Sequence, residues 1–336
     1  MTLDRTDDIF LDTVLLSDAI LLEKIKNNVN NVKISIVLSS FRSRDNLISV
    51  LTDFEAQTFK NFEIVIVDDL TTSDIEEVVN NYILKTNINY VKKQLGSASS
   101  AKNLALSYTK GEYIIFVEEG STLRPYYLEL FKNAIQNDSY DVVSIFSENN
   151  HLNIASSEIS GDDYLAKEIL KYKNNIETDL TGYMFRKKFL DVYNISFNND
   201  LLILENLYFK LETLAQAKKM YNISKIGYKK TKHKKTQRNS AMVSTTQKRV
   251  IDFTQKVEVI SNNFPTHLTE LVKLLCGYLL IEALALDEDM NNNFELTNYI
   301  KSKLNYFDRD SFFRKNLVKI SPVLFAKYIT NKESDN

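Results

Sequence analysis

KISIVLS (residues 33–39) and FEIVIVD (residues 62–68) are the two segments that decide the fold. Each is a nearly continuous run of apolar, mostly β-branched residues, and such runs are typical of strands buried on both faces of a sheet. Between them, residues 45–57 place Leu47, Val50, Leu51 and Phe54 at helical spacing. A strand, a helix and a second strand in this order predict a right-handed βαβ unit in a mainly parallel sheet.

The same alternation continues outward from these two strands. We expect helices at 73–84, at 99–109 and from about residue 125, and further strands at 88–92, 113–118 and 141–146. In sheets of this kind, ligands bind beyond the carboxyl ends of the strands. That rule selects residues 39–41, 68–72 and 118–121 as the region where a ligand would lie.

The second half of the chain has a different character. The pattern is weak over 148–180, and the later elements that it predicts are a short βα stretch at 182–190, a helix at about 201–219, a strand running into a basic segment at 228–238, and helices alone over 246–330. One of those helices is long and apolar, at 268–286. We therefore expect a helical extension (1–31), an α/β domain (32–240, with halves 32–147 and 148–240) and a C-terminal helical region (241–336) packed on it.

The composition is that of an ordinary globular protein. The 336 residues are 44% hydrophobic and 26% charged, and the formal net charge of -2 argues against nucleic-acid binding. The single cysteine, Cys276, lies in an apolar run, which favours a core cysteine in a reducing compartment. With no signal peptide and no apolar stretch of membrane-spanning length, we expect a cytoplasmic protein. Residues 312–329 mix aromatics, aliphatics and lysines, so they could either touch a membrane peripherally or pack on the main domain.

Several short segments follow one another along the chain at characteristic spacing. They are SIVLSSF (35–41), QTF (57–59), EIVIVDD (63–69), SSAKN (99–103), GEYIIF (111–116), TGYMFR (181–186) and NLYF (206–209). In this order and spacing they resemble family 2 glycosyltransferases from about Lys33 to Ser240, with Lys102 where that family usually has an arginine. The resemblance implies a GT-A fold that binds a nucleotide-diphosphate sugar and transfers the sugar with inversion.

The resemblance also implies a nucleoside site at the first two strand ends. In it, Ser39 would contact the nucleoside, Phe41 would cover the base, and Asp69 would accept the pyrimidine N–H, so the donor would be a UDP-sugar. Asp68 would support the strand end. Without the resemblance, Asp68 and Asp69 could equally be an exposed turn.

The segment Glu118-Glu119-Gly120 stands where the family has its metal-binding Asp-X-Asp motif. The resemblance implies Mn²⁺ or Mg²⁺, but the third position is a glycine without a carboxylate. Glu118 or Glu119 could reach a hard cation through its longer side chain, or the segment could be a solvated acidic loop. His233 is a second candidate metal ligand.

The catalytic base position also differs from the family pattern. The family's Glu-Asp pair at the start of the acceptor-side helix reads Glu205-Asn206 here. An asparagine amide does not accept a proton near neutral pH, and helical neighbours point about 100° apart. Glu205 is therefore not an automatic substitute for the missing aspartate.

A basic run follows the predicted acceptor half of the domain. It could neutralise a diphosphate without a metal, or hold an anionic acceptor, or be a solvated strand and loop. Lys229 and Lys230 open the run, and the residues that we select as phosphate or acceptor ligands are Lys232, His233, Lys234, Lys235 and Arg238.

Two functions remain open from the sequence. The first is an active transferase that uses a UDP-sugar to extend a cell-surface glycan or to modify a protein. The second is a catalytically inactive relative that binds glycan or nucleotide sugar and supports a partner glycosyltransferase. Homo-oligomerisation through the terminal helices is compatible with either.

Overall fold

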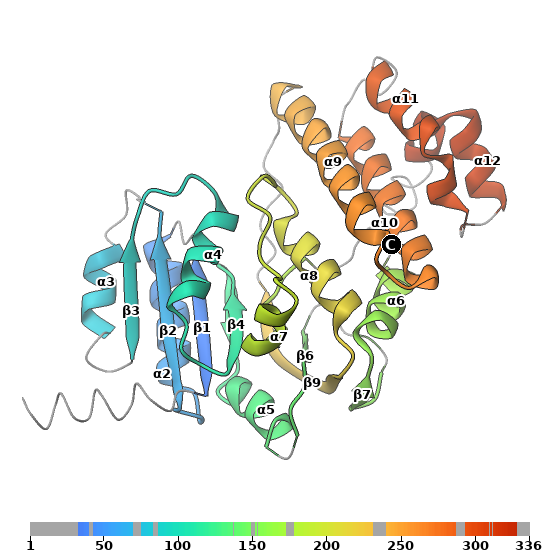
Figure 1. Cartoon of the computed structure of the whole chain (residues 1–336). Helices are drawn as coiled ribbons and strands as arrows, with labels where there is room; N and C mark the ends of the chain where they lie inside the picture. Colours follow the sequence, from blue (N-terminus) through green and yellow to red (C-terminus); the bar gives the residue numbers. More distant parts are fainter. Residues whose placement is uncertain are drawn as a thin grey trace, which may run out of the picture.

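A mixed sheet organises the computed structural model, which describes residues 33–39, 43–69, 75–82, 87–136, 138–148, 152, 154–172, 178–230, 240–286, 293–308, 310 and 312–327. Over these residues the strand order is β3-β2-β1-β4-β8-β6-β9-β5, and β7 pairs with β9. Figure 1 shows β3, β2, β1 and β4 side by side in this order. The expected N-terminal helix at 1–31 lies outside the described residues.

The first four strands along the sheet are parallel and carry the predicted core. They are β1 (Ile34–Ser39), β2 (Phe62–Asp68), β3 (Ile88–Lys92) and β4 (Tyr113–Val117). All residues of β2 and β4 are buried, as expected for strands covered on both faces. The register places Ser39 opposite Val67 and Leu38 opposite Val117, so the carboxyl ends of β1, β2 and β4 meet at one edge.

Helices cover both faces of this sheet. On one face, the buried residues of α2 (Arg44–Glu55), α3 (Ile75–Tyr82) and α5 (Tyr127–Ala134) belong to one apolar cluster with Ile34, Ile36 and Leu38 of β1. On the other, α4 (Ala98–Tyr108) packs on Val37. This division follows from the alternation of side chains along a strand.

Side-chain caps fix where two of these helices begin. The Ser43 hydroxyl accepts a hydrogen bond from the backbone N–H of Asn46 at 3.3 Å, and the Ser97 hydroxyl accepts one from that of Ser100 at 3.1 Å. Each is the first-turn contact of an N-cap serine. The caps place the amino-terminal ends of α2 and α4 beside the carboxyl edge of the parallel strands.

The second half of the sheet is largely antiparallel, which the expectation of a mainly parallel sheet did not anticipate. It contains β5 (Ser121–Leu123), β6 (Val142–Ser147), β7 (Ser157–Ile159), β8 (Tyr183–Arg186) and β9 (Met220–Lys230). Strand β8 runs antiparallel to both β4 and β6, while β6 and β9 are parallel. The helices of this half are α6 (Gly161–Tyr172), α7 (Lys187–Val192) and α8 (Glu205–Gln216).

Three elements were not predicted from the sequence. The strands β5 and β7 have three residues each, too few to show a period, and β7 and α6 lie in the segment where the pattern was weak. Helix α6 nevertheless buries Tyr164, Leu165 and Ile169.

The C-terminal helices continue the core instead of forming a separate one. They are α9 (Ser240–Ser261), α10 (Thr266–Ala285), α11 (Phe294–Ser302), a short 3-10 helix (Leu304–Phe307) and α12 (Phe312–Ile320). Helix α10 packs between α9 and α6, and its apolar residues join the core under α6 and α8. Cys276 is buried there, as predicted. Helix α9 begins at Ser240, earlier than the expected start near residue 246.

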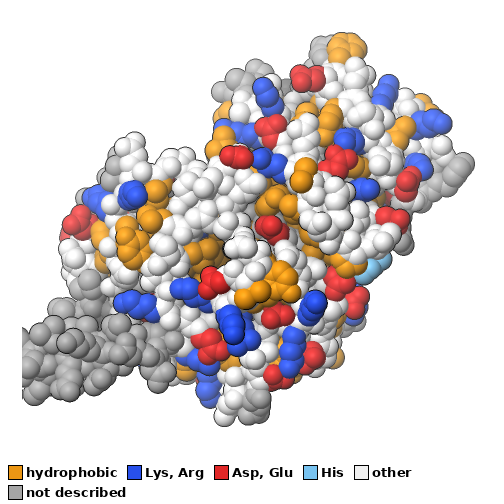
Figure 2. All heavy atoms as spheres, in the orientation of Figure 1, with side chains coloured by type: hydrophobic (Ala, Val, Ile, Leu, Met, Phe, Trp, Pro, Cys, Tyr) orange, Lys and Arg blue, Asp and Glu red, His pale blue; other side chains and the backbone are white. Residues whose placement is uncertain are grey.

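The surface carries charges of both signs. Figure 2 shows lysine and arginine side chains interspersed with aspartate and glutamate over the visible face. Among the described helices, none combines the length and the apolar character needed to span a bilayer.

Candidate functional site

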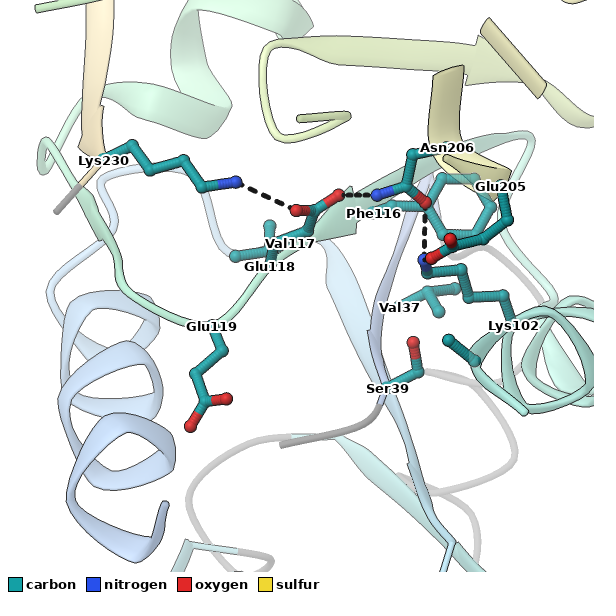
Figure 3. Close-up of a pocket in the computed structure, with 11 residues that line it drawn as sticks. Val37, Ser39, Lys102, Phe116, Val117, Glu118, Glu119, Glu205, Asn206 and Lys230 are labelled. Carbon is teal, nitrogen blue, oxygen red and sulfur yellow. Dashed lines mark hydrogen bonds and ion pairs between the residues drawn. The ribbon is translucent and has the colours of Figure 1, made fainter. Parts of the chain in front are cut away.

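A pocket of about 270 Å³ lies at the carboxyl ends of β1 and β4 (Figure 3). Five elements that are far apart in the sequence build it, namely β1, α4, β4, the start of α8 and the end of β9. The pocket brings together six of the residues selected from the sequence. Its lining is Val37, Ser39, Ala98, Lys102, Phe116, Val117, Glu118, Glu119, Glu205, Asn206 and Lys230.

A continuous line of polar contacts crosses the pocket. The Lys230 ammonium donates to Glu118 Oε2 at 2.9 Å, and the other Glu118 oxygen accepts from the Asn206 amide. The side-chain oxygen of Asn206, Oδ1, in turn accepts from Lys102 Nζ at 2.5 Å, and Lys102 pairs with Glu205 Oε1 at 3.1 Å. Charged and polar groups therefore alternate so that every neighbouring pair is a donor and an acceptor (Figure 3).

A second carboxylate stands behind Glu118. Asp179 is fully buried, and its Oδ2 lies 3.0 Å from Lys230 Nζ. Burial and the charge of Asp179 raise the pKa of Glu118, while Lys230 and Lys102 oppose that rise. Burial would lower the pKa of Lys230, but the charges of Glu118 and Asp179 and their hydrogen bonds outweigh it and raise the pKa. Lys230 is therefore a cation at neutral pH.

Glu119 faces a different part of the molecule. Its Oε1 accepts hydrogen bonds from the backbone N–H of Ser43 and from the Asn46 amide, both at 2.9 Å. These donors belong to the amino-terminal end of α2, where a carboxylate is stabilised by exposed N–H groups and by the helix dipole. The Glu119 carboxylate points away from that of Glu118 (Figure 3).

These contacts decide how well the motif fits a divalent metal. A hard cation needs several oxygens that converge on one point. The Glu118 carboxylate is instead engaged with an ammonium and an amide, Glu119 caps α2, and Gly120 offers no side chain. Gly120 also has a φ of 81°, a conformation that a side chain disfavours. The residues present at this position therefore do not fit a divalent ion.

A different acidic group lies elsewhere on the surface. Asp162, Asp163 and His267 bring ligand atoms within 4.8 Å of one another near the beginnings of α6 and α10. None of the three lines the pocket.

The start of α8 presents both Glu205 and Asn206 to the pocket. Leu204, the residue before the helix, has a φ of 58° in the left-handed region. Both side chains reach Lys102, whose ammonium lies between them. Both residues lie in the first turn of α8 and share one long partner, so the two neighbouring side chains reach the same ammonium.

The two aspartates at the end of β2 hold neighbouring structure. Asp68 is buried and accepts a hydrogen bond from the Tyr90 hydroxyl at 2.8 Å. Asp69 accepts from the backbone N–H groups of Leu95 at 2.5 Å and Gly96 at 3.1 Å. The alternative of an exposed turn is therefore wrong for Asp68, and Asp69 holds the loop that leads into α4.

Some of the selected residues cannot be placed in this pocket. Phe41 and the basic residues Lys232, His233, Lys234, Lys235 and Arg238 lie outside the described part of the chain. Conversely, sequence reasoning treated Lys230 only as one member of the basic run and did not single out Asp179. The one available signal for Asp179 was its place two residues before the segment TGYMFR.

Comparison with known proteins agrees with this architecture. Residues 35–193 match the family model described as glycosyl transferase family 2. Glycosyltransferase GlyG of Streptococcus pneumoniae is 28% identical over 144 residues, which cover 40% of this chain and 46% of GlyG. Poly(ribitol-phosphate) beta-N-acetylglucosaminyltransferase TarP of Staphylococcus aureus is 24% identical over 206 residues, covering 55% of this chain and 58% of TarP. The chain thus spans about half the length of these relatives or slightly more.

Solved structures show the same fold over most of the chain. The crystal structure of S. aureus TarS 1-349 in complex with UDP-GlcNAc aligns with a TM-score of 0.56 at 17% identity, covering 85% of this chain and 90% of that one. Mannosyltransferase PcManGT from Pyrobaculum calidifontis, in complex with GDP-Man and Mn²⁺, aligns with a TM-score of 0.53 at 11% identity, covering 90% and 79%. The fold is therefore that of the GT-A glycosyltransferases. Residues 35–193, slightly less than half of the chain, are similar to glycosyl transferase family 2.

Proposed function

We propose that this protein transfers a sugar from a UDP-sugar to a glycan acceptor with inversion. The observation that carries the proposal is the convergence of Lys102, Glu118, Glu205 and Lys230 in one pocket at the carboxyl edge of the parallel strands. This edge is where α/β sheets of this type bind ligands. The pocket offers both cations for a diphosphate and a carboxylate for an acceptor hydroxyl.

Two observations support a UDP-sugar as the donor: the residues at the strand ends and the names of the relatives. Ser39 lines the pocket, and Asp69 lies at the neighbouring strand end, so the nucleoside would lie across the ends of β1 and β2. The role of Phe41 in covering the base rests on the resemblance alone. The related TarS was solved with UDP-GlcNAc, and the curated relative WfaP is named as a UDP-Glc-dependent glucosyltransferase.

Glu205 is the proposed catalytic base. Its carboxylate lines the pocket with a side-chain exposure of 17%, and Lys102 holds it in place. In the inverting step, the acceptor hydroxyl oxygen forms a bond to the anomeric carbon while the bond from that carbon to the diphosphate breaks. The hydroxyl proton goes to Glu205, and the electron pair of the broken bond leaves with UDP. Asn206 positions Glu118 and takes no proton.

The acceptor class follows from the same relatives. TarP is named for poly(ribitol-phosphate), and WfaP for a sugar linked to diphosphoundecaprenol. We propose a cell-surface glycan as the acceptor, with a protein acceptor as the alternative. Acceptors of this kind would suit a cytoplasmic protein that touches the membrane peripherally. Ile320 and Leu324 on the C-terminal helices are exposed and could make such a contact.

The alternative function is a non-catalytic relative that binds nucleotide sugar or glycan and supports a partner glycosyltransferase. The specific observation in its favour is that the position of the family's aspartate is Asn206, whose amide is fully engaged with Lys102 and Glu118.

One experiment separates the two functions. The 336-residue chain is incubated with a panel of UDP-sugars, and UDP release is measured with and without an undecaprenyl-linked or poly(ribitol-phosphate) acceptor. Acceptor-stimulated release supports the transferase. UDP binding without any release from the whole panel would favour the non-catalytic relative.

A further inference from the structure

Strand pairing brings Lys230 to the position of the altered metal motif. Lys230 is the last residue of β9, and β9 runs antiparallel to β5 with Lys230 opposite Ser121. Ser121 directly follows the Glu118–Gly120 turn in the chain. The sheet register therefore fixes Lys230 beside Glu118, although 112 residues separate them in sequence.

The fully buried carboxylate of Asp179 and the partly buried one of Glu118 surround the Lys230 ammonium. Its Nζ lies 2.9 Å from Glu118 and 3.0 Å from Asp179, while 23% of its side chain remains exposed toward the pocket. Removing two carboxylates from water without a cation between them would be strongly unfavourable. In this structure the ammonium supplies that cation, at the place where the family pattern predicts a metal.

The pocket carries two positive charges on opposite sides. Lys230 and Lys102 lie at the two ends of the line formed by Glu118 and Asn206 (Figure 3). Together they have the formal charge of one divalent ion. The two lysines come from different elements, β9 and α4, and both line the same pocket. Ammonium groups form charge-assisted hydrogen bonds with phosphate oxygens.

We propose that Lys230 replaces the divalent metal and binds the diphosphate of the donor, so that this protein binds UDP without a metal ion. The inference rests on the proposed function and deepens it by naming the group that receives the leaving diphosphate. When the bond between the anomeric carbon and the diphosphate oxygen breaks, negative charge develops on that oxygen. Lys230 and Lys102 stabilise this charge by charge-assisted hydrogen bonds.

Calorimetric titration of the 336-residue chain tests this, with UDP and uridine as probes, in buffer with EDTA and in buffer with Mn²⁺. We expect UDP to bind with the same affinity in both buffers. In Lys230→Met, which keeps an unbranched side chain of similar length, UDP affinity should fall by about tenfold or more while uridine affinity is unchanged. Lys229→Met is the matched control, because Lys229 is the adjacent lysine, is 57% exposed and pairs with Glu148 at 3.5 Å.

Lys230→Met leaves the negative charges of Glu118 and Asp179 without the ammonium that pairs with both, so a second variant is needed. Lys230→Met combined with Asp179→Asn removes one charge of each sign, and the oxygen of the new amide could still accept the two hydrogen bonds that Thr181 donates to Asp179. The same loss of UDP affinity is expected in this double variant. The metal titration of the unmodified chain gives an answer even if neither variant folds.

Three outcomes overturn the inference, and they can be told apart. If UDP binds only with Mn²⁺, the proposed function stands and the metal replacement is wrong. If a Lys230 variant folds and binds UDP with unchanged affinity, the ammonium only pairs with Glu118 and Asp179 and does not bind the diphosphate. If the unmodified chain binds no UDP in either buffer, the proposed function falls as well.

Discussion

The side-chain amide of Asn206 donates a hydrogen bond to the Glu118 carboxylate, which ties together the two positions where the sequence departs from the family pattern. An amide can donate to a carboxylate and accept from Lys102 at the same time, whereas a second carboxylate could only accept. The glutamate in the metal motif and the asparagine at the base position are therefore compatible with each other. Replacing either Glu118 or Asn206 by the aspartate of the family pattern would therefore disturb the hydrogen bond between them.

Asn206→Asp should fail to restore a catalytic base. It places two carboxylates in contact, and their repulsion raises the pKa of the pair above its value in the unfolded chain, although Lys102 and Lys230 oppose that rise. The protonated pair therefore stabilises the folded protein at low pH, and this contribution is lost as the pH rises through that pKa. We expect a free energy of unfolding about 1–3 kcal/mol below the unmodified protein at pH 7, and a smaller deficit at pH 5.

Urea denaturation at both pH values measures this effect. Asn199→Asp is the control, because Asn199 is exposed and its Oδ1 only accepts, from Ser100 and Asn103. If Asn206→Asp is as stable as the unmodified protein at pH 7 and transfers sugar faster, the prediction is wrong. The asparagine would then only remove the catalytic base that the family has at this position.

Glu205→Gln should abolish most transfer while leaving donor binding intact. The amide keeps an oxygen for Lys102 but does not accept the acceptor proton. We expect the turnover rate to fall by about a hundredfold to ten-thousandfold, with UDP affinity within about twofold of the unmodified chain.

The matched control for that experiment is Glu212→Gln on the same helix. Glu212 lies outside the pocket lining, and burial raises its pKa, so its amide variant should be slightly more stable at neutral pH with unchanged turnover. A Glu205→Gln protein with full turnover would remove Glu205 from the proposed mechanism.

Glu119 should prove to be a helix cap and not a metal ligand. Glu119→Ala removes the acceptor for Ser43 N–H and for the Asn46 amide, so the free energy of unfolding should fall by about 1–2 kcal/mol. UDP affinity with and without Mn²⁺ should not change. Glu77→Ala, which removes a 66% exposed carboxylate on α3, controls for the loss of a surface charge. A large loss of Mn²⁺-dependent UDP affinity in Glu119→Ala, with normal stability, would contradict the assignment.

The parts of the fold that could be predicted are those set by local pattern. Residues 62–68 were expected as a strand and are β2, because a run of apolar residues buried on both faces has no other stable place. The short strand β5 gave no such signal, since three residues show no period. Its antiparallel pairing with β9 is a long-range property of the sheet.

The site divides in the same way. Lys102, Glu205 and Asn206 could be selected through the resemblance to the family, and Glu118 also because it stands at a predicted strand end. The position of Lys230 depends on the β5–β9 register, and that of Asp179 on the loop before β8, so neither follows from local sequence.

The backbone of Leu204 is the last feature that we expect to be essential for the site. Its φ of 58° costs a leucine roughly 1 kcal/mol or more, yet its carbonyl accepts the first-turn hydrogen bond from Tyr208 N–H at 2.9 Å. Its side chain packs partly buried against the core, which holds the strained conformation in place. This conformation aims Glu205 and Asn206 at Lys102.

Leu204→Ile keeps the volume but adds a β-branch that disfavours the left-handed region, so α8 should begin differently and lose the contacts to Lys102. We expect lower stability together with a loss of transfer of about tenfold or more, measured by denaturation and by UDP release. Leu204→Asn tolerates the conformation and should keep more activity than Leu204→Ile despite its smaller apolar surface. Leu202→Ile, at a 56% exposed position two residues earlier, is the control for the β-branch itself. The asparagine variant is the worse substitute for packing but the better one for the left-handed backbone. If Leu204→Ile transfers sugar faster than Leu204→Asn, the left-handed conformation of residue 204 does not orient Glu205 and Asn206.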